Sequence, residues 1–96
     1  MKIIKRSGAE VVFEREKIAD AIKKANEQVI DAKKLSDAQI ASIVDDIEIE
    51  CHNSDHALNV EDIQNLVENG IMQNGAFDVA KLYITYRFRH ELMRKE

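Results

Sequence analysis

Residues 2–18 have the sequence KIIKRSGAEVVFEREKI, and this stretch decides the fold because it joins a tight turn to a helix. Two short apolar runs, Ile3-Ile4 and Val11-Val12-Phe13, lie on either side of Gly8. Glycine adopts the positive φ of a tight turn without a steric penalty. The pattern therefore predicts a β-hairpin with a loop of about two to four residues.

A helix is predicted directly after the hairpin. The apolar residues that follow Phe13 recur at helical spacing, and they are Ile18, Ala21, Ile22, Ala25 and Val29. This periodicity predicts a helix that begins near residue 15 and ends near residue 30.

Cations gather where the predicted hairpin meets this helix. Lys5 and Arg6 enter the turn, and Lys17 lies in the first turn of the helix. Free backbone N–H groups at a helix start favour anions, so these cations indicate a phosphate site. An alternative stays open at this point, in which the cations only protect a sheet edge in solvent.

The composition indicates one small, helix-rich domain over residues 1–96. The chain is 45% hydrophobic and 33% charged, with no proline and three glycines, which favours helices over an all-β fold. The formal net charge of −4 disfavours a general nucleic-acid binder, because affinity for phosphate backbones comes from Lys and Arg.

The cellular compartment is also constrained. The single cysteine, Cys51, excludes an internal disulfide framework and indicates a reducing environment. The sequence shows no signal peptide and no apolar run long enough to span a membrane. We therefore expect a cytoplasmic protein.

The rest of the chain predicts further helices and one short strand. A polar linker at residues 31–34 leads to a second helix, capped by Ser36 or Asp37, whose apolar stripe is Ile40, Ile43, Val44, Ile47 and Cys51. Residues 57–60 fit a short third strand, and a third helix follows as far as Asn74-Gly75. A fourth helix, over about residues 77–94, is apolar nearly all round and is expected to be central. The predicted fold is α+β, a four-helix bundle capped by a two- or three-stranded sheet.

Arg87 is an unusual residue of the fourth helix. At about 100° per residue it falls inside the apolar arc, and burying an unpaired charge is costly. The side chain must either extend to solvent or pair with a carboxylate at the edge of the core, such as Glu68.

The sequence gives little support for a glycine-rich nucleotide loop, a metal site or a catalytic site. The chain has neither a G-x-x-x-x-G-K-[ST] loop nor a G-x-G-x-x-G loop, so any nucleotide must be held by side-chain cations and a helix start. Cys51, His52, Asp55 and His56 are close in sequence, but no C-x-x-C pair completes a metal site. Inert packing of Cys51 and exposure of the histidines explain this cluster more simply, so we predict neither a metal site nor catalysis.

Four sequence blocks, in order, resemble the ATP-cone family. The family patterns are V/I-x-K-R-x-G, V-x-F-[DN]-x-x-K-I, V-E-D-I-Q-x-x-V-E and A-x-x-Y-I-x-Y-R. The corresponding segments here are IIKRSG at 3–8, VVFEREKI at 11–18, VEDIQNLVE at 60–68 and AKLYITYR at 80–87. The resemblance covers nearly the whole chain and is most similar to the cone of anaerobic, class III, ribonucleotide reductases.

The resemblance implies an allosteric regulatory domain without catalytic residues. In this family ATP and dATP compete, with Mg²⁺ on the phosphates; ATP keeps a ribonucleotide reductase active and dATP switches it off by changing the oligomer. The implied partners are adenine nucleotides, the catalytic body of a reductase and, in a nucleotide-dependent homo-oligomer, further copies of the chain. The alternatives are a degenerate cone that acts as a non-nucleotide interaction module, and the cone of a transcriptional repressor of reductase genes.

The resemblance also assigns a binding site. Its phosphate-binding positions fall on Lys5, Arg6, Lys17, Arg87 and His90, and its base and ribose pocket falls on Ile3, Val11, Glu14, Ile18, Val60, Ile63 and Gln64. The chain departs from the family pattern at three places. Glu14 stands where Asp or Asn is usual, Ser7 where Asp is frequent, and His90 where some members carry Lys or Arg.

Overall fold

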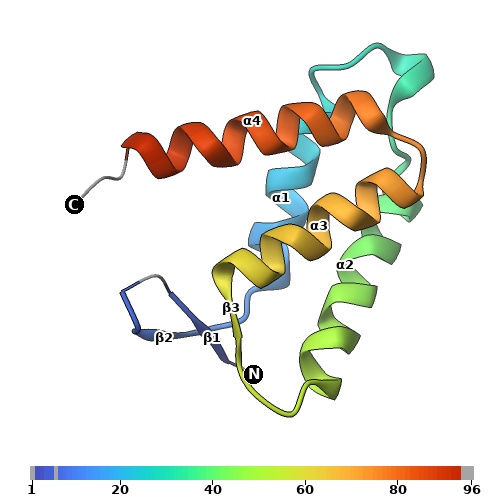
Figure 1. The fold of residues 1–96 in the computed structure, drawn as a ribbon. Coiled ribbons are helices and arrows are strands. Elements are labelled where there is room, and N and C mark those ends of the chain that lie inside the picture. The colour runs from blue at the N-terminus through green and yellow to red at the C-terminus, as the bar shows by residue number, and fades with distance from the viewer. Residues whose placement is uncertain (1, 6, 94–96) are drawn as a thin grey trace.

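The computed structural model describes residues 2–5 and 7–93, with side chains described as far as residue 89. The predicted α+β architecture is confirmed, because helices packed as a bundle are capped at one end by a three-stranded sheet (Figure 1). The elements in chain order are β1 Lys2–Ile4, β2 Glu10–Val12, α1 Arg15–Asn26, the 3₁₀ helix η1 Asp31–Lys33, α2 Asp37–Asn53, β3 Leu58–Asn59, α3 Val60–Gln73 and α4 Phe77–Met93.

The sheet has β1 at its centre. Strands β1 and β2 form the predicted antiparallel hairpin, and β3 pairs in parallel with the other edge of β1, with Ile3 opposite Leu58. The turn is closed by backbone hydrogen bonds from the Lys5 N–H to the Ala9 carbonyl and from the Gly8 N–H to the Lys5 carbonyl, each 2.8 Å long. Gly8 has a φ of 91°, which explains why glycine occupies this turn.

Capping boxes start the helices α2 and α3. The Ser36 hydroxyl accepts from the Gln39 N–H at 3.1 Å, and the Gln39 side chain accepts from the Ser36 N–H at 2.8 Å. Asn59 and Asp62 make the same reciprocal pair at 2.8 and 3.2 Å. These contacts satisfy backbone donors that a helix start leaves unpaired, and they identify Ser36 as the cap of α2.

Helix α1 ends earlier than its apolar periodicity predicts. The last helical residue is Asn26, whereas the prediction was residue 30. The Asn26 side chain donates to the Leu35 carbonyl at 3.0 Å and accepts from the Leu35 N–H at 2.7 Å. These contacts tie the end of α1 to the chain that returns toward α2, and the predicted linker contains the 3₁₀ helix η1.

One hydrophobic core joins the helices to the sheet. Its most buried side chains come from all four α-helices, and they are Ile22, Ile40, Val44, Val67, Ile71 and Val79. Ile3 of β1 and Phe13, directly after β2, are 8% and 9% exposed and belong to the same core. These two residues hold the hairpin against the bundle.

Helix α4 is not buried on all sides, so the expectation of a central helix was wrong. One side of α4 contacts α1 and α3, whereas Phe77, Ile84 and Phe88 are exposed. At about 100° per residue these three residues lie on one narrow stripe, which faces solvent. A chain of this size offers neighbours for only part of the helix surface. No helix among the described residues is long and apolar enough to cross a bilayer.

Gly70 allows α2 and α3 to approach closely. A Cβ atom built on Gly70 would lie 2.9 Å from Cγ2 of Ile43. Ile43 is buried and branched at Cβ, so it cannot move aside without disturbing the core.

We predict that Gly70→Ala destabilises the chain by about 1–2 kcal/mol, because overpacking outweighs the gain of about 1 kcal/mol in helix propensity. Urea unfolding measures the effect, and Asn69→Ala at the exposed neighbouring position is the control. Stabilisation by Gly70→Ala, as at an ordinary helical glycine, would contradict the close contact.

Candidate functional site

A cleft of about 430 Å³ opens where the hairpin meets the starts of α1 and α3. Figure 1 shows these three segments close together at the sheet end of the bundle. Predicted site residues line the cleft from distant parts of the sequence, and they are Ile3, Lys5, Val11, Glu14, Lys17, Ile18, Val60, Ile63 and Gln64. A volume of this size lies within the usual range of small-molecule sites, about 300–1,000 Å³.

Two lysines and one carboxylate give the cleft its charge. Lys5 follows β1, is exposed, and has no ion-pair partner among the described residues. Lys17 lies in the first turn of α1, and its Nζ is 3.4 Å from a carboxylate oxygen of Glu14. Glu14 occupies the N-cap position of α1 without making a side-chain capping bond. The start of α1 therefore keeps backbone N–H groups that a ligand could use.

The other wall of the cleft is mostly apolar. Ile3 and Ile63 are buried at its base, while Val11 is 38% exposed. Apolar side chains beside a few polar groups are typical of sites that bind a flat ring and fix its orientation.

Gln64 places a polar atom in this apolar wall. Its Oε1 is buried and has no hydrogen-bond partner among the described residues. An unpaired buried acceptor costs free energy, and such atoms are rare in native structures. Because Gln64 lines the cleft, a ligand N–H or O–H could satisfy this oxygen.

The structure adds Val12, Ala21 and Tyr83 to the predicted lining. Ala21 belongs to the apolar face of α1, and Tyr83 to the sequence block AKLYITYR of α4. The sequence pattern of Ala21 and Tyr83 is equally typical of core residues, because periodicity alone does not separate a core residue from one at the base of a cleft.

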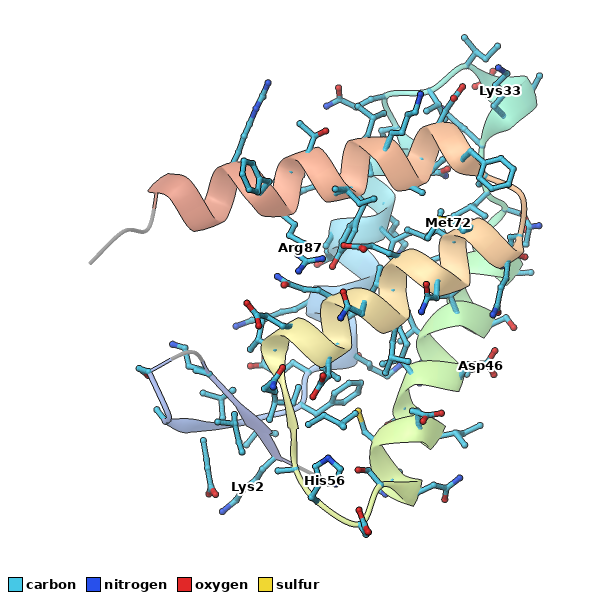
Figure 2. The ribbon with its side chains drawn as sticks, in the orientation of Figure 1. Lys2, Lys33, Asp46, His56, Met72 and Arg87 are labelled. Atoms are coloured by element: carbon cyan, nitrogen blue, oxygen red, sulfur yellow. The ribbon has the colours of Figure 1, made fainter. Side chains whose placement is uncertain are left out.

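Arg87 does not line the cleft. Its Nη1 donates to a carboxylate oxygen of Glu68, which was the partner proposed from the helical arc. Figure 2 shows Arg87 projecting from α4 toward α3. The assignment of Arg87 to the phosphates stays a prediction. Arg6 and the side chain of His90, the remaining predicted phosphate ligands, lie outside the described residues.

Tyr83 connects the ion pair to the cleft. Burial is the largest cause that raises the pKa of its phenol to about 12; the nearby Glu68 carboxylate also raises this pKa, and the Arg87 guanidinium lowers it. Both charged partners therefore lie close enough to the phenol to affect its ionisation.

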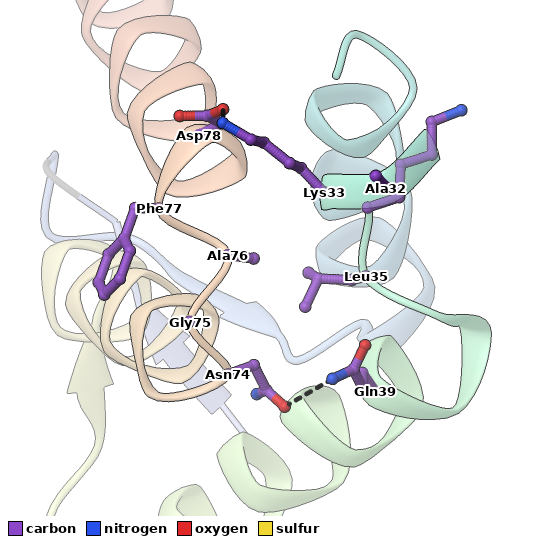
Figure 3. A pocket seen from close by; sticks show the side chains of 10 residues that line it. Ala32, Lys33, Leu35, Gln39, Asn74, Gly75, Ala76, Phe77 and Asp78 are labelled. Carbon is purple, nitrogen blue, oxygen red and sulfur yellow. Dashed lines mark hydrogen bonds and ion pairs between the residues drawn. The ribbon is translucent and has the colours of Figure 1, made fainter. Parts of the chain in front are cut away.

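Two other hollows offer less to an anionic ligand. The first, of about 280 Å³, lies between η1 and the start of α4 (Figure 3). Its Lys33 is 3.3 Å from Asp78, and its Gln39 donates to Asn74 at 3.3 Å. These polar groups are already paired within the protein.

The second hollow contains the cluster that suggested a metal. Cys51, His52, Asp55 and His56 line it together with Lys2. Among the described residues no group of three or more His, Cys, Asp or Glu side chains could hold a metal ion. Burial raises the pKa of the Cys51 thiol, which favours the unreactive protonated form.

The pKa of Tyr83 predicts a dependence of stability on pH. The folded-state value of about 12 lies above the ordinary value of 10.0, so folding favours the neutral phenol. This contribution is present below pH 10.0 and is lost as the pH rises toward 12, by about 2–3 kcal/mol in total. Urea unfolding between about pH 9 and about pH 11.5 should show a steeper loss for the wild type than for Tyr83→Phe. An equal loss in both would contradict the burial of the phenol, and Tyr86→Phe is the control.

Comparison with known proteins finds ribonucleotide reductases that are similar to this chain. The chain is 32% identical over 91 residues to the alpha subunit of ribonucleoside-diphosphate reductase from Chlamydia pneumoniae, covering 88% of this chain and 9% of that protein. It is 34% identical over 105 residues to the vitamin B12-dependent ribonucleoside-diphosphate reductase of Thermoplasma acidophilum, covering 99% and 12%. The anaerobic ribonucleoside-triphosphate reductase of Salmonella typhimurium is 29% identical over 94 residues, covering 98% and 13%.

The chain spans about a tenth of the length of these relatives, 9–13%. A family model described as the ATP cone domain matches residues 1–92, and the match supports a nucleotide-binding regulatory role in place of a catalytic one. The chain therefore belongs to the ATP-cone domain family.

Proposed function

We propose that the cleft binds ATP or dATP, with Mg²⁺ on the phosphates, and that this binding controls the overall activity of a ribonucleotide reductase. The observation that carries the proposal is convergence. Residues near 3–5, 11–18 and 60–64, assigned to a nucleotide from separate sequence blocks, line one cleft together. If the blocks packed together only to form a core, their polar residues would not be expected to line the same cleft.

The phosphates would bind at the mouth of the cleft. Lys5 and Lys17 provide cationic donors there, and the start of α1 adds backbone N–H groups. The Glu14 carboxylate in the same lining repels a bare triphosphate. A divalent cation on the phosphates offsets this repulsion, which is why we expect the magnesium complex to be the ligand.

The base and ribose would occupy the apolar wall. Ile3, Ile18 and Ile63 provide surfaces on which a flat ring can pack. The unpaired Oε1 of Gln64 is an acceptor for a ligand donor, such as an exocyclic amine or a ribose hydroxyl.

Regulation requires a partner. The relatives are reductases of which this chain matches about a tenth, 9–13%. We infer that the domain acts on a reductase catalytic body in the cytoplasm, and that the bound nucleotide changes how the chains assemble.

A second candidate function is protein interaction without a nucleotide. The solvent-facing stripe of Phe77, Ile84 and Phe88 on α4 favours it, because exposed apolar surface is typical of docking sites. This function predicts no effect of nucleotides on stability.

The test of the nucleotide proposal is thermal unfolding with Mg²⁺ and ATP, dATP, GTP or no nucleotide. A ligand at about 100 times its Kd stabilises the fold by about 2.7 kcal/mol, which raises Tm by several degrees. We expect shifts with ATP and dATP, and a smaller shift or none with GTP. The absence of a shift with adenine nucleotides would favour the interaction module.

We predict that Lys5→Ala and Lys17→Ala each weaken MgATP binding by about tenfold, because each removes one charge-assisted contact. Calorimetry measures the affinity, and the fold should survive since both lysines are exposed. Lys24→Ala, at an exposed position of α1 outside the cleft, is the control. Unchanged affinity in both cleft variants would overturn the phosphate assignment.

Gln64→Met removes the unpaired oxygen while keeping the side-chain length. We expect the free chain to be as stable as the wild type or more stable, because a buried unsatisfied acceptor is lost. Nucleotide affinity should fall by about five- to tenfold. Gln73→Met, at an exposed position of the same helix, is the control. Undiminished affinity of Gln64→Met would show that the ligand does not use this oxygen.

A further inference from the structure

The ion pair between Arg87 and Glu68 is well shielded from solvent. The two side chains are 20% and 14% exposed, whereas those of the pair Lys33–Asp78 are 60% and 48% exposed. Shielding strengthens the attraction between the partners and makes an unpaired charge at this place costly. Glu68 therefore neutralises Arg87 effectively while the pair is intact.

The pair lies beside the cleft. Glu68 is one helical turn beyond Gln64 on α3, and Arg87 is one turn beyond Tyr83 on α4. Gln64 and Tyr83 both line the cleft, and both members of the ion pair influence the ionisation of the Tyr83 phenol. Arg87 is thus a cation that borders the cleft without lining it.

Among the described residues, the cleft lining carries little positive charge compared with a triphosphate. Its lining provides Lys5 and Lys17, and Glu14 offsets one of them. A triphosphate carries several negative charges, so it would attract Arg87 and repel Glu68. The forked guanidinium of an arginine matches the geometry of a phosphate as well as that of a carboxylate, so Arg87 is chemically suited to either partner.

We propose that Glu68 is a built-in competitor of the bound phosphates, holding Arg87 away from the cleft until a triphosphate takes its place. This inference rests on the proposed function. The affinity for a triphosphate then depends on how much more strongly Arg87 interacts with the bound phosphates than with Glu68. The exchange of partners also links the contact between α3 and α4 to the presence of the ligand.

The test uses Glu68→Gln in the 96-residue chain, with MgATP and inorganic tripolyphosphate as probes and adenosine as the uncharged comparison. We expect affinity for both polyanions to rise by about three- to tenfold, because the competing charge is gone. Affinity for adenosine should not change. The unliganded variant should melt a few degrees below the wild type, since Arg87 has lost its partner.

Opposite signs of these two effects distinguish a competitor from a structural group. If Glu68 only stabilised the fold, the variant would lose stability with unchanged affinity. If Glu68 oriented Arg87 for the ligand, affinity would fall. Either result overturns the proposal.

Two further variants test whether Glu68→Gln acts through Arg87 or only through the change in net charge. Asp78→Asn makes the same change in net charge and breaks an exposed pair at the opposite end of the bundle, so its effect on affinity should be small. In an Arg87→Ala background, Glu68→Gln should lose most of its benefit. An equal benefit with and without Arg87 would mean that Glu68 acts only by repulsion, which contradicts the exchange.

The same measurements identify which inference fails. If neither the wild type nor Glu68→Gln binds MgATP or tripolyphosphate, the proposed function is contradicted. A wild type that binds both, with a Glu68→Gln variant of equal affinity, leaves the function intact and rejects the exchange.

Discussion

The geometry of the candidate site depends on the anchoring of a very short hairpin to the helical core. Each strand of the hairpin has only three residues, and an isolated two-stranded ribbon is marginally stable in water. Ile3 and Phe13 bury themselves among the helices, and burial of such side chains contributes about 1.5–3 kcal/mol each. Pairing of β3 with β1 adds backbone hydrogen bonds. This anchor places Lys5 on the same cleft as Lys17, although the sheet itself is too small to hold that geometry.

Much of the fold follows from local sequence signals. The turn glycine, the capping residues and the apolar stripes predict the hairpin and the helix starts, because each depends on residues close together in the chain. The end of α1 could not be predicted in this way. Asn26 stops the helix through hydrogen bonds to Leu35, which lies nine residues later. Burial around α4 was also misjudged, since apolar composition does not say how many neighbours a helix will have.

The candidate site was less predictable than the fold from local sequence signals. Local chemistry identified the cations at the junction of hairpin and helix, but only the family resemblance connected them with Val60 and Gln64 on a distant helix. Tyr83 was missed because a buried tyrosine and a cleft-lining tyrosine have the same sequence pattern. Arg87 belongs to both interpretations, as a core-edge ion pair in the unliganded chain and as a proposed phosphate ligand. The sequence pattern around Arg87 fits either partner, so it does not decide between the carboxylate and a phosphate.

The most direct test of the central claim is a titration of the ¹⁵N-labelled chain with MgATP, followed by two-dimensional NMR of the backbone amides. The account predicts that the largest chemical-shift changes surround the cleft, at Lys5, Lys17 and Gln64. Residues of the hollow at the other end of the bundle, such as Ala32 and Asn74, should change little. Changes concentrated at that second hollow, or no changes at millimolar nucleotide, would contradict the assignment of the cleft.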